Sequence, residues 1–596
     1  MACGALRSPR GSAVNGRGAM ARPSPEGLRD RHRPTYHPGM CGRTSRLLAA
    51  SPGAHLGAAL MALGFAACSS SSPPATPEPT YPEKDRAAEA VRLLSGPGWY
   101  RHAVFYEVYV RSMQDSDGDG VGDLPGLTSR LDELQELGVD ALWLMPVMPS
   151  PLADSGYDVS DYHGIHPDYG DMPAFDAFVA AAQARGIRVM LDLVLNHTSV
   201  EHAWFLESRQ DRTNPRADWY VWSDTPSRPD IPCGPVPTFG TSAWTWDAVR
   251  GQYYFHRFFQ AQPDLNFWNP DVVAATLDVV RFWLDRGVDG FRCDVIGLLY
   301  ESPAGCSMIP ETTAYIRDLR SVLDAYPNRA MVAEPTWFGL AAPFYGNGQD
   351  MFHMAFDFDF GFSWPNLFAN SSAQTIADHF AAVQQGLPPG AQNAIYLSNH
   401  DLSRAYARSS GIASRWRRAA LIQATMPGTP FLYYGEELAL RPGAQVMVDR
   451  RDYARTPMPW SAGAGWGFTT GQPWLAFGAQ PESTNLEAER ADPGSNYAFY
   501  QALLALRRGR EAFGTGSLRL LPTSDPSILL YVRESADETY VVAVGMDEGA
   551  RHYGVAAGAD LPGDARRLLG DATLVREGTA ARVWVPPAGM GVFRVR

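Results

Sequence analysis

Short apolar runs alternate with amphipathic segments from residue 103 onward. Eight runs have the length and the β-branched or aromatic content of strands: Ala103 to Met113, Ala141 to Val147, Arg188 to His197, Gly290 to Ile296, Ala330 to Glu334, His353 to Phe358, Asn393 to Asp401 and Pro430 to Glu436. Between them leucines and valines recur at helical spacing, as at Leu127, Leu131, Leu134 and Leu137. This alternation predicts an α/β fold, a parallel sheet closed into a (β/α)8 TIM barrel. The alternative is an open doubly wound sheet, but no glycine-rich phosphate turn follows the first run.

Two regions depart from this rhythm. Residues 198–262 are irregular and rich in tryptophan, which predicts a small domain inserted after the third strand. Beyond residue 512 short β-rich runs follow one another, as in the segments 527–532 and 539–544, and predict a C-terminal antiparallel β-sandwich. The barrel is therefore assigned to residues 99–197 and 263–512, the inserted domain B to 198–262, and the sandwich to 513–596.

The first hundred residues have a different character. Residues 1–39 are rich in Arg, Gly and Pro without an apolar period, and are interpreted as disordered or as coding sequence upstream of a true start at Met40. Residues 40–68 combine a short basic stretch with an apolar run, which is typical of a secretory signal and too short for a permanent membrane span. Residues 69–98 are expected to be a linker.

The end of this signal predicts a location. Small residues before Cys68 resemble a bacterial lipobox, although Phe65 stands where leucine is usual. Cys68 would then carry a lipid, the only membrane contact expected, and place the protein at the cell envelope, on the periplasmic or outer surface. The alternative is ordinary cleavage and secretion.

Composition narrows the partners. The net charge of −13 gives no electrostatic basis for binding nucleic acid, while 16 tryptophans and 25 tyrosines among carboxylates suit a sugar site. An oligosaccharide is therefore the expected substrate, and the chain is expected to act as a monomer. Of the cysteines beyond Cys68, at most two can pair, and Cys233 with Cys306 is favoured over pairs with Cys293.

The stretch DSDGDGVGDL, residues 115–124, has the alternating acids of a calcium loop. It is not an EF-hand, because the twelfth position is Gly126 where a glutamate should close the loop. The spacing still suits one structural Ca²⁺ held by Asp115, Asp117, Asp119, the Val121 carbonyl and Asp123. The alternative is a solvated acidic turn.

Charged residues gather where the predicted strands end, which is where barrel enzymes carry their chemistry. The set comprises Asp192, Asn196, His197, Arg292, Asp294, Glu334, Asn399, His400 and Asp401. Strand alternation places Arg292 and Asp294 on one face, and the arginine is expected to lower the pKa of Asp294, as a carboxylate nucleophile requires. Glu334 ends an apolar strand, so desolvation is expected to raise its pKa toward about 6, which suits a general acid. The alternative is that each charge is a surface or ion-pairing group.

Read together, the segments 192–197, 290–294 and 399–401, with Glu334 between the last two, resemble the α-amylase superfamily of glycoside hydrolases, family 13. The resemblance implies a retaining reaction in which Asp294 is the nucleophile, Glu334 the acid/base and Asp401 the transition-state stabiliser. Arg292, His197 and His400 would hold the sugar and the nucleophile.

Further segments resemble the oligo-1,6-glucosidase and α-glucosidase branch. These are QPDLN at 262–266, the calcium loop, SGYD at 155–158, and RDYARTPMPW at 451–460. The resemblance implies that Tyr157 stacks on the non-reducing glucose and that Arg451, or else Arg455, closes the pocket behind Asp154. Val295 is similar to α-1,6-acting members, although a plain strand valine explains it as well.

The expected function is exo-acting hydrolysis of malto- or isomalto-oligosaccharides. An α-amylase or a trehalose-forming transglycosylase is the alternative within the same chemistry. A non-catalytic sugar-binding lipoprotein is the alternative of another class, which the three carboxylates Asp294, Glu334 and Asp401 disfavour.

Overall fold

The computed structural model describes residues 80–82, 84–228, 231, 242–303, 305–335, 339, 341–370, 372–444 and 451–596. They belong to one compact unit that spans residues 76–596. The expected signal with Cys68, and the expected disulfide partner Cys233, lie outside the described residues. No helix of the described part is both long and apolar enough to cross a membrane.

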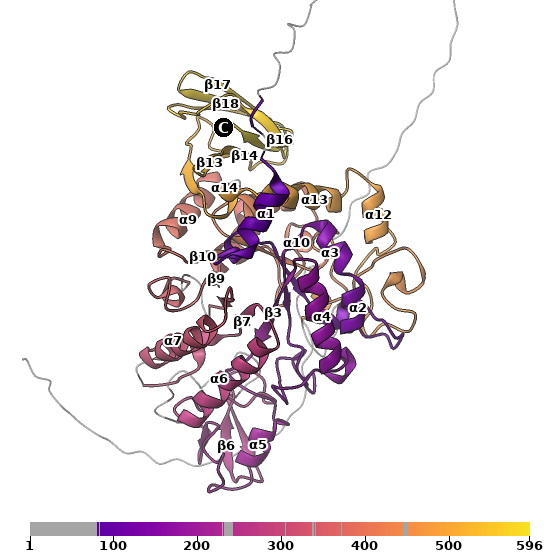
Figure 1. The fold of residues 1–596 in the computed structure, drawn as a ribbon, viewed down its shortest axis with the longest axis vertical. Helices are drawn as coiled ribbons and strands as arrows, with labels where there is room; N and C mark the ends of the chain where they lie inside the picture. Colours follow the sequence, from indigo (N-terminus) through magenta and orange to yellow (C-terminus); the bar gives the residue numbers. More distant parts are fainter. Residues whose placement is uncertain are drawn as a thin grey trace, which may run out of the picture. The chain divides into compact units, whose positions relative to one another are not determined.

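Eight parallel strands close into a barrel in the order β1-β11-β10-β9-β8-β7-β3-β2 (Figure 1). They are β1 (Phe105–Val108), β2 (Ala141–Leu144), β3 (Arg188–Leu193), β7 (Gly290–Cys293), β8 (Ala330–Ala333), β9 (Met354–Phe356), β10 (Gln392–Tyr396) and β11 (Thr429–Tyr433). Each of the eight predicted runs overlaps one of these strands, so the predicted barrel is confirmed. The strands are shorter than the runs because each run continued into the loop that carries polar groups at the strand end.

Helices cover the outside of the barrel. They are α2 (Leu124–Ser129), α3 (Leu131–Leu137), α4 (Met172–Ala184), α6 (Pro270–Asp285), α7 (Pro310–Asp324), α8 (Phe358–Ala369), α9 (Ala373–Gly386), α10 (Ala405–Arg408), α11 (Ala413–Thr425), α12 (Leu486–Ala491), α13 (Asn496–Arg507) and α14 (Glu511–Gly514). Local sequence sets their starts: Asn269 caps α6, with its side chain accepting from the Asp271 N–H, and Pro270 occupies the first turn. Buried Val272, Val279 and Trp283 then form the inward face of α6.

The barrel interior is packed by alternate residues of the strands. One apolar cluster joins Phe105, Trp143, Met190, Val332 and Phe431, all at most 1% exposed. Because the period of a strand is two, the residue two positions further along each strand also points inward, nearer the carboxyl end. On β3 and β8 those positions are Asp192 and Glu334, so the site is built directly on top of the core.

The predicted linker 69–98 is wrong for its last part. The segment Arg86–Ser95 forms helix α1, capped by Asp85, whose carboxylate accepts from the N–H groups of Ala87 and Ala88. Ala90 and Leu93 of this helix are buried. An alanine-rich sequence with a good cap and an apolar stripe forms a helix when it packs on a surface. The polar residues around the segment hid this helix from the sequence analysis.

Between β3 and β7 lies the expected insertion. Helix α5 (Ala203–Ser208) precedes a three-stranded antiparallel sheet of β4 (Trp222–Ser223), β6 (Gln252–Phe255) and β5 (Trp244–Asp247). Aromatic side chains pack in its core, with Phe205 stacked on Trp222 at 5.5 Å between ring centroids, whereas Trp246 of β5 is exposed. Figure 1 shows this sheet at the end of the barrel opposite the C-terminal strands.

The C-terminal region consists of two antiparallel sheets, as expected. One has the order β12-β13-β14-β19-β16 and the other β15-β18-β17. Their bounds are β12 (Ser517–Leu520), β13 (Ile528–Glu534), β14 (Thr539–Gly545), β15 (His552–Ala556), β16 (Arg566–Gly570), β17 (Thr573–Glu577), β18 (Ala580–Val585) and β19 (Met590–Arg594). Fully buried Arg533 joins this region to the barrel, because it donates to the carbonyls of Thr425 and Gly516.

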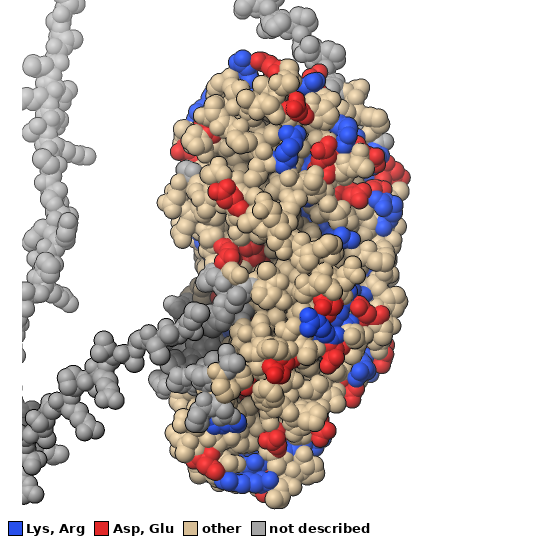
Figure 2. All heavy atoms as spheres, turned by 90° about the vertical axis from the view of Figure 1, so that its left-hand side faces the viewer, with Lys and Arg blue, Asp and Glu red and all other residues tan. Residues whose placement is uncertain are grey.

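Charge is mixed over the surface that Figure 2 presents. Acidic and basic side chains are interspersed there, without a continuous run of either sign.

Gly290, at the start of β7, yields the first prediction. A Cβ at this position would lie 1.7 Å from the Ala330 carbonyl oxygen on the paired strand β8. We expect Gly290→Ala to lower the free energy of unfolding by about 3 kcal/mol, because the two backbones must separate. Urea unfolding measures it, with Gly96→Ala as the control, since no atom lies within 4 Å of a Cβ there. Equal midpoints for the two variants would refute the close approach.

Candidate active site

Strand register brings the first charged groups together. Asp192 of β3 lies opposite Arg292 of β7, and Arg292 lies opposite Val332 of β8. Both charged side chains point into the barrel and are at most 2% exposed. Glu334 follows β8 directly. It lies two residues beyond Val332, so its side chain points to the same side of the strand.

One guanidinium serves three carboxylates. Nη1 of Arg292 lies 2.9 Å from Oδ1 of Asp192 and 2.6 Å from Oδ1 of Asp294, and Nη2 lies 2.9 Å from Oε2 of Glu334. The Val295 N–H also donates to Oε2 of Glu334 at 2.9 Å. The two acids of the predicted pair therefore meet around a single cation and the peptide that follows the nucleophile.

Aromatic groups complete the wall beside Asp192. The Tyr157 hydroxyl donates to Oδ2 of Asp192 at 2.9 Å, and the Trp143 indole N–H donates to the same oxygen at 3.2 Å. The Tyr157 ring is stacked on His400, with centroids 5.2 Å apart. Tyr157 thus has a fixed ring orientation before any sugar arrives.

A second arginine lies across the cavity. Nη2 of Arg451 binds the carboxylate of Asp154. Nη1 of Arg451 lies 2.6 Å from Oδ1 of Asp401. Gln262 donates to the other oxygen of Asp154 at 3.0 Å. Arg455 lies deeper, where its Nε donates to the carbonyl oxygen of His400. The structure therefore pairs Arg451 with Asp154, whereas Arg455 supports the loop behind it.

His197 is a buried donor aimed at this space. Its Nδ1 lies 3.3 Å from the Asn196 amide, and its Nε2 has no hydrogen-bond partner among the described residues. Burial lowers the pKa of His197 to about 3, so the ring is neutral. A neutral imidazole with a free nitrogen suits a sugar hydroxyl.

These groups line one cavity of about 390 Å³, which is the size of a monosaccharide site with room for a leaving group. Its lining consists of Asp154, Tyr157, His197, Phe258, Asp294, Val295, Glu334, His400, Asp401 and Arg451. Arg292 lies beneath it and contacts two of the lining acids. All the residues predicted for catalysis and sugar binding thus lie in or directly under one cavity.

Burial decides the protonation of the two central acids. Desolvation raises the pKa of Asp294 to about 7, in spite of Arg292, and that of Glu334 to about 8. Arg292 does act to lower the pKa of Asp294, as expected, but the effect of burial is larger, and Asp192 and Asp401 add negative charge nearby, so the net pKa is raised. Asp401 behaves differently. Desolvation would raise its pKa, but the neighbouring His400 and the positive charges of Arg451 and Arg455 hold it below the ordinary value.

Val295 has a backbone conformation that is rare for a β-branched residue. Its φ is 36° and its ψ 35°, in the left-handed region. The strand-like valine considered as an alternative is therefore not what this position holds. The turn aims the Val295 N–H at Glu334 and presents the Val295 side chain to the cavity, so strain is retained where it orients a reacting group.

Part of the predicted calcium loop forms a compact acidic cluster. Asp115, Asp117 and Asp123 offer oxygens that all lie within 4.8 Å of one another. Asp119 is not in this group, and its carboxylate accepts the Val121 N–H instead. Three carboxylates with converging oxygens fit a hard cation, which takes six to eight oxygen ligands. Of the other predicted groups, Cys293 is a free buried thiol and Cys306 is disulfide-bonded.

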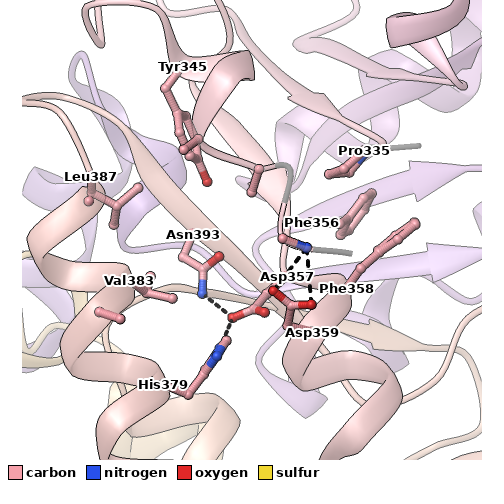
Figure 3. Close-up of a pocket in the computed structure, with 15 residues that line it drawn as sticks. Pro335, Tyr345, Phe356, Asp357, Phe358, Asp359, His379, Val383, Leu387 and Asn393 are labelled. Carbon is pink, nitrogen blue, oxygen red and sulfur yellow. Dashed lines mark hydrogen bonds and ion pairs between the residues drawn. The ribbon is translucent and has the colours of Figure 1, made fainter. Parts of the chain in front are cut away.

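A second, smaller cavity of about 210 Å³ lies next to the residue that follows the acid, Pro335. Figure 3 shows Asp357 at its floor, where the carboxylate accepts from Asn393 and pairs with His379, both at 2.8 Å. Asp359 accepts the Gly339 N–H. No described residue lines both cavities.

Comparison with known proteins agrees with this geometry. The family model described as alpha amylase, catalytic domain, matches residues 107–516. The chain belongs to the α-amylase family of glycoside hydrolases. Members of this family act on O-glycosyl bonds, as glycosidases or as transglycosylases, and this α-amylase family chain is therefore an enzyme of that kind.

Its relatives carry both kinds of name. The chain is 38% identical over 505 residues to "Trehalose synthase/amylase TreS" of Mycobacterium tuberculosis (strain CDC 1551 / Oshkosh), covering 77% of this chain and 83% of the relative. It is 33% identical over 558 residues to "Oligo-1,6-glucosidase" of Heyndrickxia coagulans, covering 81% and 98%. Among solved structures, the alpha-glucosyl transfer enzyme XgtA has a TM-score of 0.73 and 34% identity, over 84% of this chain and 99% of that one.

Sequence reasoning gave no role to two residues of this α-amylase family site. Phe258 lines the cavity from the inserted region, and nothing in the pattern distinguished it from the other aromatics there. Glu107 lies behind His400, with Oε1 2.6 Å from Nδ1. An acid inside an otherwise apolar strand, FYEV, was the signal that could have found it.

The two raised pKa values predict a narrow pH profile. Attack requires Asp294 without its proton and Glu334 with its proton, so kcat/KM should fall below about pH 7 and again above about pH 8. Initial rates with a chromogenic α-glucoside across the pH range measure both limbs. Glu334→Gln should lack the alkaline limb. A wild-type rate that continues to rise well above pH 8 would contradict the assignment of Glu334 as the acid.

Proposed function

We propose that this enzyme is a retaining, exo-acting α-glucosidase that cleaves the terminal glucosyl unit of malto- or isomalto-oligosaccharides. The observation that carries the proposal is the bridge of Arg451 between Asp154 and Asp401, because all three line the cavity that holds the reacting acids. We infer that this bridge closes one end of the cavity. A closed end admits the terminus of a chain and not its interior. The branch resemblance of the 451–460 segment supports the same interpretation.

The reaction takes two steps. Glu334 donates its proton to the glycosidic oxygen while a carboxylate oxygen of Asp294 attacks the anomeric carbon, so that the sugar–oxygen bond breaks and a glycosyl ester forms. Glu334, now ionised, removes a proton from water, which attacks the same carbon and frees Asp294. Two inversions give retention.

Charge placement supports these roles. Glu334 has the higher pKa of the pair and Asp294 the lower, so the proton resides on the acid between the two values. Asp401 stays ionised beside its arginines and can stabilise positive charge that develops at the anomeric carbon. Arg292 binds both acids and so keeps contact with the charge as it moves from one to the other.

A trehalose synthase-type transfer is the second candidate. It differs only in the acceptor, because a sugar hydroxyl instead of water attacks the glycosyl ester. The relative named trehalose synthase/amylase and the structural neighbour named alpha-glucosyl transfer enzyme favour it.

Product analysis separates the candidates. We expect glucose from maltose and from isomaltose, with little loss of starch viscosity, because a closed pocket excludes internal bonds. The relative rates on the two disaccharides give the linkage preference. Trehalose as the main product from maltose would favour the second candidate, and rapid loss of starch viscosity would refute exo action. Asp294→Asn is the control, and its rate should fall by about 1000-fold or more, because it removes the nucleophile.

The acidic cluster supports a structural Ca²⁺ as a separate proposal. Asp115, Asp117 and Asp123 would hold the ion, which would tie the first barrel loop to the later segment around Thr469, since Thr469 already donates to Asp115.

Calcium should therefore stabilise the fold without taking part in turnover. After chelation, added Ca²⁺ at 100 times its Kd should raise the free energy of unfolding by about 2.7 kcal/mol, measured as a rise in Tm. Asp117→Ala should abolish the rise. Asp119→Ala is the matched control and should keep it, because Asp119 lies outside the cluster. The proposal is refuted if wild-type Tm ignores both chelator and calcium.

A further inference from the structure

Glu107 is a buried acid to which the reaction scheme above gives no role. It lies on β1 inside the barrel, 2% exposed, between Trp143 of β2 and Tyr433 of β11. Its Oε1 lies 2.6 Å from Nδ1 of His400 and 3.3 Å from the His400 N–H. His400 in turn lines the reaction cavity.

The hydrogen bonds around Asp192 fix the direction of the next link. Asp192 is approached by the guanidinium of Arg292, the indole N–H of Trp143 and the hydroxyl of Tyr157. Arg292 and Trp143 have only donors, so Asp192 acts as an ionised acceptor. Tyr157 must then donate its single proton to Asp192.

The tautomer of His400 follows. Nε2 of His400 lies 2.7 Å from the Tyr157 oxygen. Because the Tyr157 proton points to Asp192, this oxygen can only accept, and Nε2 must carry a hydrogen. Nδ1 then has two alternatives. Either it also carries a hydrogen, which makes a His400 cation beside an ionised Glu107, or it accepts a proton from a neutral Glu107.

The surroundings favour the neutral pair. Separated charges in this dry interior would be costly unless the neighbours compensated them, and the neighbours compensate them only in part. Asp401 favours a cation on His400, but Arg455, Arg292 and Arg451 disfavour it. Arg292 favours an anion on Glu107, but Asp401 and Asp192 disfavour it, and Tyr433 also faces Glu107. Burial raises the pKa of Glu107 well above its ordinary value and lowers that of His400 well below.

We infer that Glu107 is a neutral carboxylic acid that donates its proton to Nδ1 of His400 and thereby holds the Nε2 hydrogen toward Tyr157 and the sugar pocket. Glu107 is a positioning residue that acts through His400. The chain of hydrogen bonds runs from Glu107 through His400 and Tyr157 to Asp192, which accepts and which shares Arg292 with the nucleophile. Orientation of the sugar-binding tyrosine therefore starts from a proton on Glu107, behind His400.

The role in sugar binding rests on the proposed function, but the protonation of Glu107 does not. Infrared spectra of the unliganded protein test it without substrate. The difference between wild type and Glu107→Gln at neutral pH should contain the C=O stretch of a carboxylic acid, shifted in D₂O. Glu538→Gln is the matched control, because Glu538 is equally buried but paired with Arg86, and it should lose only carboxylate bands. Carboxylate bands in the Glu107 difference would overturn the inference.

A second measurement tests the inference on wild-type protein, in case the Glu107→Gln variant does not fold. Wild-type protein labelled with ¹³C at the glutamate carboxyl should keep a carboxylic acid band above about pH 8, where Glu334 has lost its proton. Disappearance of all such bands at that pH would equally overturn the inference.

Kinetics give the functional arm. The amide of Glu107→Gln can donate to Nδ1 as the acid does, so kcat/KM should remain within about 3-fold of wild type with an unaltered pH profile. Glu107→Leu leaves Nδ1 without a donor, and we expect a loss of about 10- to 100-fold, the usual effect of one unpaired buried polar group. If glutamine and leucine are equally damaging, the negative charge matters and the neutral acid is excluded. If wild type has no activity on any α-glucoside, the proposed function fails while the infrared result stands.

Discussion

Arg292 is the interaction on which the site depends. A single buried guanidinium contacts Asp192, Asp294 and Glu334, and each of those carboxylates would otherwise be an uncompensated charge inside the barrel. Breaking a buried ion pair from one side typically destabilises by about 3 to 5 kcal/mol. Burial raises the pKa of Asp294 and of Glu334 toward neutral pH, and one cation shared among three acids only partly offsets that effect.

A second group of charged residues surrounds Asp401 and has a different effect on protonation. Asp401 is surrounded by Arg451, Arg455 and His400 and stays ionised, while Asp294 and Glu334 remain close to their titration points. Three carboxyl groups in one cavity thus titrate differently, as the roles proposed for Asp401, Asp294 and Glu334 require. The distribution of arginines among the acids, and not the acids themselves, separates the roles.

The barrel was predictable because its signals are local. Eight apolar runs and the polar residues after them lie in the order of the chain, and strand alternation already puts Arg292 and Asp294 on one face. The pKa of Asp294 was not predictable in this way, because the sequence shows the arginine two residues away but neither the complete burial of the carboxyl nor the approach of Asp192 from another strand. Helix α1 was not predicted, because the residues on which it packs lie far along the chain. The role of Glu107 was not predicted, because the tautomer of His400 depends on four side chains from separate loops and strands.

The N-terminal segment has a practical consequence for anyone trimming this chain. The family match begins at Glu107, in the middle of β1, and ends before β12. Upstream, Arg86 donates to the Gly509 carbonyl and binds buried Glu538, and Arg594 donates to the Pro82 carbonyl. Hydrogen bonds and an ion pair thus join the first described residues to the last strands. A protein cut to the matched region would lose half of strand β1 and these contacts between the N-terminal segment and the last strands, so we expect the excised segment to be less stable than the whole chain.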